Sequence, residues 1–102
     1  MVTTGLDWWR NREFLSEVDV HRDAIAGFDA QNRIQICGTL LERTQEVRGT
    51  NKLYFFDQDG SVLGKHRKIH LFPLFHEDEH LQAGDVISVF DTALGRVGLG
   101  IC

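Results

Sequence analysis

A lysine and a cysteine carry the clearest chemistry in this sequence. Lys68 ends a basic run that starts at Lys65, and Cys102 is the last residue. A thiol attacks carbon only as thiolate, so near neutral pH it needs a base or a nearby cation. The tetrahedral adduct carries a negative oxygen, which an ammonium group beside the nucleophile can stabilise. Lys68 could meet both needs, and the pair predicts nucleophilic attack on a carbonyl or nitrile carbon.

Two histidines near Lys68 offer an alternative. His66 or His70 could act as the base for Cys102, as in papain-like Cys-His sites. From the residues alone, Lys68 and His70 are almost equally good candidates for the partner of the thiol.

A third pattern is the sequence from His76 to His80, which matches the H-E-x-x-H signature of zinc proteases. That chemistry needs both histidines on one face of a stable helix and a third ligand. Here Pro73 and Gly84 flank the stretch, and acidic residues fill both x positions. We therefore expect a solvated loop and no metal.

Two turn sequences predict the hairpins that would position these groups. Residues 53–56 and 62–66 flank a turn ending in Gly60, and the second strand would deliver Lys68 near its C-terminal end. Residues 86–90 and 96–101 would turn near 94–95. In that last strand Gly98, Gly100 and Cys102 share a face, which leaves bare backbone on the side of the thiol.

The other segments are expected to build the frame. A helix should start with Ser16 as its cap and end at Asn32 in the left-handed conformation, with an apolar stripe between them. Residues 34–41 should form an interior strand covered on both faces, with Cys37 as a small buried residue. Residues 71–84 should form an irregular loop over the site. The adjacent Trp8 and Trp9 could anchor a surface loop or wall a substrate pocket.

Composition excludes several classes of function. The 102 residues carry a net charge of −4, which argues against a nucleic acid or an anionic membrane surface as partner. No apolar run approaches the ~20 residues of a membrane span, and no signal pattern follows Met1. Two cysteines do not make a disulfide framework in such a chain. A cytoplasmic protein is the default expectation.

Several blocks in the expected order resemble the carbon-nitrogen hydrolase (nitrilase) superfamily. The blocks are residues 67–72 (Arg-Lys-Ile-His-Leu-Phe), Glu77 seven residues before Gly84-Asp85, residues 90–92, and residues 95–102, which end in Gly-Leu-Gly-Ile-Cys. The resemblance implies an α/β fold, part of an αββα sandwich with a mixed sheet and covering helices. It also implies a Glu-Lys-Cys triad with Lys68 as the lysine, Cys102 as the nucleophile and Glu77 as a supporting glutamate.

The resemblance further implies a cysteine-dependent hydrolase of non-peptide carbon-nitrogen bonds that releases ammonia from a small linear amide through a thioester. No metal or organic cofactor is required, and a homodimer or higher homo-oligomer is expected. The ending of the lysine block is closer to the amidase branches than to true nitrilases. The substrate stays unidentified.

One triad member is missing from the match. The general-base glutamate would precede Met1, so residues 1–102 are expected to form a partial domain that lacks the base and everything after the nucleophile. Such a chain alone should not hydrolyse amides. The alternative is a catalytically inactive member or fragment that serves as a binding or assembly module.

Overall fold

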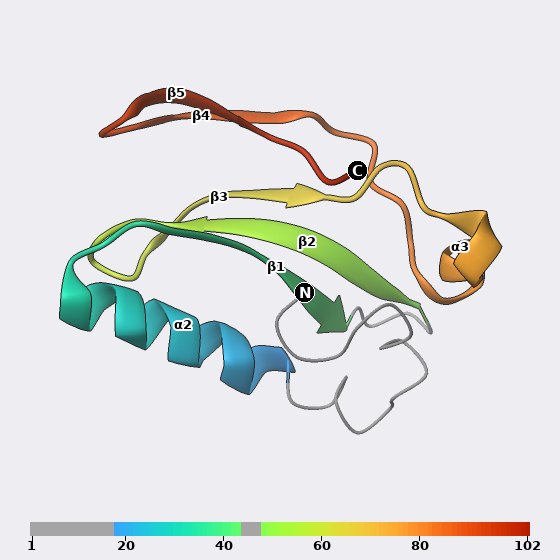
Figure 1. Cartoon of the computed structure of the whole chain (residues 1–102), viewed down its shortest axis with the longest axis horizontal. Helices are drawn as coiled ribbons and strands as arrows, with labels where there is room; N and C mark the ends of the chain where they lie inside the picture. The colour runs from blue at the N-terminus through green and yellow to red at the C-terminus, as the bar shows by residue number, and fades with distance from the viewer. Residues whose placement is uncertain (1–17, 44–47) are drawn as a thin grey trace.

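The structure is a computed structural model, and it describes residues 18–43 and 48–102. Three layers are visible in Figure 1: a helix, a three-stranded sheet and a two-stranded hairpin. The expected helix cap at Ser16 and the tryptophans Trp8 and Trp9 lie outside the described residues. Among the described helices, none combines the length and apolar character that crossing a membrane requires. The elements are α2 (Val18–Asn32), β1 (Ile36–Arg43), β2 (Gly49–Phe56), β3 (Val62–Arg67), η2 (Pro73–Phe75), α3 (Glu77–His80), β4 (Ser88–Thr92) and β5 (Gly95–Leu99).

The helix ends at Asn32, but the residue in the left-handed conformation is the next one. Arg33, with a φ of 54°, takes the left-handed conformation that was expected of Asn32. The side chain of Asn32 instead donates a hydrogen bond to the carbonyl oxygen of Phe28 at 2.8 Å. This bond satisfies one of the carbonyl groups left open at the helix end. Phe28, a member of the predicted apolar stripe, is 57% exposed.

The first sheet has the order β1-β2-β3, and both pairings are antiparallel. The predicted hairpin between residues 53–56 and 62–66 is confirmed, with Gly60 at a φ of 83° in its turn. The prediction for residues 34–41 is wrong in two respects. The strand β1 lies at an edge of this sheet, and Cys37 is exposed. Only one face of β1 is covered by α2, which leaves alternate side chains on the other face open to solvent.

The second hairpin, β4-β5, packs against the sheet on the face opposite α2 (Figure 1). The predicted turn is confirmed, and Gly95 lies within it at a φ of 109°. The ring of Phe90 meets Phe55 edge-on, with 5.5 Å between ring centroids. The same ring lies so close to Gly64 that an added Cβ would fall 2.2 Å from it. Glycine at this position therefore lets the hairpin approach β3.

We expect Gly64→Ala to destabilise the fold by about 1–3 kcal/mol, because the new methyl group would push Phe90 out of its seat. Gly27→Ala is the matched control, since it lies within α2 and nothing occupies the space within 4 Å of its added Cβ. That change should stabilise by about 0.5–1 kcal/mol through helix propensity. Urea unfolding measures the change in the free energy of unfolding for both variants. Changes of the same sign would contradict the close packing of Phe90 on Gly64.

Asp29 is a fully buried carboxylate near the end of α2, and neither of its oxygens has a hydrogen-bond partner among residues 18–43 and 48–102. Burial raises the pKa of Asp29 above the usual value of an aspartate, and the charges of Asp57 and Asp59 raise it further. A carboxyl group whose pKa is raised by folding supports the fold below its unfolded pKa, and this support is lost as pH rises through the folded pKa.

Asp29→Asn should therefore raise the melting temperature at pH 7, and the gain should shrink as pH falls toward about 4. Asp23→Asn provides the control, because the Asp23 side chain on the same helix is 72% exposed. Thermal melts from pH 4 to 8 provide the comparison. A gain that is independent of pH, or a loss at pH 7, would contradict the prediction.

Candidate active site

Lys68 and Glu77 form a buried ion pair just past the end of β3. The Nζ atom of Lys68 lies 2.7 Å from Oε2 of Glu77, and the two residues are 7% and 4% exposed. The same carboxylate oxygen accepts the backbone N–H of Phe72 at 2.8 Å. A buried charge is tolerated only when it is paired and hydrogen-bonded, and here the two donors meet that need. Both charged residues were predicted from the sequence as site residues, and the structure brings them together.

Backbone bonds on both sides fix the position of Lys68. Its N–H donates to the carbonyl oxygen of Asn51 at 2.9 Å, which continues the β2-β3 pairing by one residue. Its own carbonyl oxygen accepts the N–H of Gly84 at 2.8 Å. An added Cβ at Gly84 would fall 2.6 Å from the carbonyl oxygen of Arg67, so glycine permits this close contact. The loop from Lys68 to Gly84 is thus closed at its base.

The loop is more regular than predicted, because it contains η2 and α3 (Figure 1). His76 lies between the two turns with a φ of 58°, outside α3, whereas His80 ends α3. The two histidines of the H-E-x-x-H match therefore do not share a helix face. The Nδ1 atom of His76 lies 2.9 Å from Oε1 of Glu79, and Glu77 is engaged with Lys68. Among the described residues, no cluster of three or more His, Cys, Asp or Glu side chains could hold a metal ion.

The hairpin sets the direction in which the chain approaches Cys102. Phe90 lies over Gly64, while the hydroxyl of Ser88 donates to the carbonyl oxygen of Lys65 at 2.8 Å. As the residue number falls from 90 to 88 along β4, it rises from 64 to 65 along β3. The strand β4 therefore runs opposite to β3, and β5, which is antiparallel to β4, runs in the same direction as β3.

The register of β5 directs the last three residues toward the end of β3 that precedes Lys68. Leu99 pairs with Ser88, so it lies level with Lys65. Cys102 follows Leu99 by three residues, as Lys68 follows Lys65. In Figure 1 the C-terminus accordingly lies at the end of β3. The thiol is exposed, and it reaches the same end of the molecule as the Lys68–Glu77 pair.

The two rival bases differ in their surroundings. His66 is buried, with 4% exposure, and its Nδ1 atom has no hydrogen-bond partner. His70 is exposed and lies beyond the strand end. Among the described residues, neither contacts a carboxylate that would orient it as the base of a Cys-His pair. Of the candidate cations and bases, Lys68 is the one whose orientation is fixed by a buried partner.

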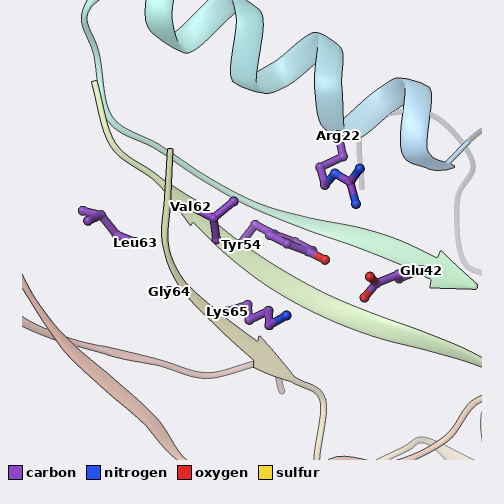
Figure 2. Close-up of a pocket in the computed structure, with 7 residues that line it drawn as sticks. All are labelled: Arg22, Glu42, Tyr54, Val62, Leu63, Gly64 and Lys65. Atoms are coloured by element: carbon purple, nitrogen blue, oxygen red, sulfur yellow. The ribbon is translucent and has the colours of Figure 1, made fainter. Parts of the chain in front are cut away.

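A separate hollow of about 480 Å³ lies on the α2 face of the sheet (Figure 2). Arg22, Tyr54, Glu42 and Lys65 line its polar side, and Glu42 is also ion-paired with Lys52. Burial raises the pKa of Tyr54 to about 12, and the Glu42 charge adds to the shift, so the phenol stays neutral. Side chains alternate along β3, so Lys65 points to the face opposite that of Lys68. The hollow is therefore not part of the site.

Sequence reasoning missed three groups that support the ion pair: the Phe72 N–H, the Asn51 carbonyl and the side chain of Leu81. The two backbone groups leave no mark in a sequence. Leu81 did leave one, because it is a single leucine in the otherwise polar run from His76 to Gln82. It is 1% exposed.

Glu77→Gln should destabilise the fold by about 3–5 kcal/mol, because it leaves the buried Lys68 ammonium without an opposite charge. Glu79→Gln is the matched control two residues away, since its carboxylate is 63% exposed and faces His76. Its effect should be small. Chemical denaturation measures the free energy of unfolding of both variants. Equal decreases in the two variants would contradict the prediction that the Lys68–Glu77 pair contributes more than an exposed pair.

Comparisons with known proteins identify the family and the fold of the chain. The sequence model of the family described as carbon-nitrogen hydrolase matches residues 9–102. An omega-amidase of Xenopus laevis is 49% identical over 76 residues, which cover 68% of this chain and 28% of that protein. An omega-amidase of Saccharomyces cerevisiae is 41% identical over 79 residues, covering 68% of this chain and 26% of that protein. The chain thus spans little more than a quarter of the length of these relatives.

Solved structures share the fold. The crystal structure of a Saccharomyces cerevisiae member of branch 10 of the nitrilase superfamily superposes with a TM-score of 0.71. It is 32% identical, and the match covers 81% of this chain and 30% of that chain. The NitN amidase of Neterenkonia sp. AN1 has a TM-score of 0.84 at 17% identity, with 97% of this chain and 39% of that chain covered. The predicted α/β sandwich fold is confirmed.

Proposed function

Since the chain belongs to the carbon-nitrogen hydrolase family, we propose that it forms part of a cysteine-dependent amidase in which Cys102 is the nucleophile. The observation that carries the proposal is the buried Lys68–Glu77 pair at the same end of the molecule as the exposed thiol. A fixed ammonium beside a thiol is the arrangement that stabilises both a thiolate and the oxyanion of its adduct.

The reaction follows from these groups. The thiolate of Cys102 attacks the amide carbon, and the electron pair of the C=O bond moves to the oxygen, which Lys68 stabilises. The general base, which removed the proton of the thiol, gives that proton to the amide nitrogen; the C–N bond breaks, ammonia leaves, and a thioester remains on Cys102. Water attacks the thioester, the carboxylic acid leaves, and the thiol is restored. Glu77 orients Lys68 throughout by holding its ammonium group.

The substrate we propose is a small linear molecule with a terminal amide. Two relatives that share 41–49% of aligned residues with this chain are named omega-amidases, and one structural neighbour is named an amidase. The chain covers 28% of the length of the first of these relatives. We therefore propose that turnover belongs to a longer polypeptide that adds the general-base glutamate and a backbone donor for the oxyanion. Homo-oligomers of that protein are part of the same proposal.

Cys102→Ala in the full-length hydrolase should abolish release of ammonia from a simple ω-amide such as glutaramate, because no other group forms the thioester. Cys37→Ala is the control and should stay within a few-fold, since Cys37 lies on β1, outside the site. Lys68→Arg should lose most of kcat, because the planar guanidinium cannot place its charge at the same point.

The result that would overturn the proposal is loss of activity in Cys37→Ala with retention in Cys102→Ala. Near-normal kcat in Lys68→Arg would move the cationic role to His70, because Lys65 points to the opposite face of the sheet. A full-length protein with no turnover of any amide would instead support a binding or assembly module.

A further inference from the structure

The Glu77 carboxylate, which pairs with Lys68, belongs to α3, a helix too short to be stable alone. Glu77 is the first residue of α3, which has four residues and no side-chain cap. A single isolated turn is unstable, because fixing its backbone costs more than its few hydrogen bonds return. The position of Glu77 must therefore come from outside the turn.

Leu81 supplies that attachment. It follows α3 directly, and its N–H donates to the carbonyl oxygen of Glu77 at 2.8 Å. Its backbone forms a parallel bridge with Gly49 at the start of β2, and the next N–H, that of Gln82, donates to the carbonyl oxygen of Gly49 at 2.8 Å. A Cδ atom of Leu81 would lie 3.5 Å from a Cβ added at Gly49. One residue thus ties α3 to the sheet through backbone and side chain.

No other apolar side chain of the loop is buried to the same degree. Phe72, Leu74 and Phe75 are 47%, 76% and 38% exposed, and Ile69 and Leu71 are half-buried, while Leu81 is 1% exposed. The Arg48 guanidinium also reaches α3, through a 3.4 Å bond to the carbonyl oxygen of Asp78, but both residues are exposed. Burial of the Leu81 side chain is therefore the main hydrophobic contribution that holds the loop against the sheet.

We propose that Leu81 is a positioning residue for the reaction, acting through Glu77 on Lys68. Leu81 touches neither the thiol nor the ammonium, and it works by fixing the height of α3 above the sheet. If α3 shifts, the carboxylate no longer meets both Lys68 Nζ and the Phe72 N–H. Displacement of a catalytic group by about 1 Å can cost on the order of a hundredfold in rate. This inference rests on the proposed amidase function.

A double-mutant cycle in the full-length hydrolase tests the inference. Leu81→Ala should lower kcat by about tenfold to a hundredfold and leave KM within about twofold, because oxyanion stabilisation acts in the transition state. Glu77→Gln should lower kcat at least as much. In the Glu77→Gln background, Leu81→Ala should cost no further activity, because its route of action is already removed. Kinetics are compared well below each variant's melting temperature.

Two further variants separate positioning from general stability. Leu81→Met conserves volume and should restore most of kcat, whereas Leu94→Ala, at a 79% exposed leucine in the β4-β5 turn, should leave kcat unchanged. If Leu81→Ala does not fold, the milder Leu81→Val takes its place in the cycle.

Additive losses in the cycle would overturn the inference, as would normal kcat in both Leu81→Ala and Leu81→Val. Those outcomes differ from failure of the proposed function itself. If the proposed function fails, the unsubstituted enzyme and Cys102→Ala show the same background turnover of amides. The double-mutant cycle then has no enzymatic rate to compare.

Discussion

The buried ion pair between Lys68 and Glu77 is the constraint on which this part of the molecule depends. Neither charge could remain in a nearly water-free position alone, since the cost of an unpaired buried ion is several kcal/mol. Each residue therefore requires the other, and the loop from Lys68 to Gly84 must fold back onto the end of β3. The N–H of Gly84 bonds to the Lys68 carbonyl oxygen at the base of this loop, and the N–H of Phe72 bonds to the Glu77 carboxylate within it.

The two hairpins could be predicted from the sequence, because their turns contain residues that favour the turn conformation. Gly60 and Gly95 adopt positive φ in the turns where the two hairpins were expected, and the first hairpin delivers Lys68 to the end of its strand. Lys68 and Glu77 were identified by family resemblance. No periodicity or spacing would have shown that a glutamate nine residues away folds back onto the lysine.

The errors have a common physical origin. Residues 34–41 read as an interior strand, and Cys37 as buried, because an apolar run does not reveal which of its faces will be covered. The helix stop was assigned to Asn32 on intrinsic preference, yet the side chain of Asn32 bonds to Phe28 and Arg33 takes the left-handed conformation. The turns η2 and α3 were not expected, because a four-residue helix depends on tertiary contacts and has no sequence period of its own.

Two packing contacts between residues that take no part in the reaction position the elements of the candidate site. On one side, the absence of a side chain at Gly64 seats Phe90 on β3, and this seat fixes the level at which β5 delivers Cys102. On the other side, Leu81 against Gly49 fixes the level of Glu77, and through it the ammonium of Lys68. The two contacts lie on separate elements and share no residue, so each can be disturbed alone. Packing on both sides therefore sets the position of the β4-β5 hairpin and the position of α3 on the sheet. The charges of Lys68 and Glu77 then interact between elements that are already held in place.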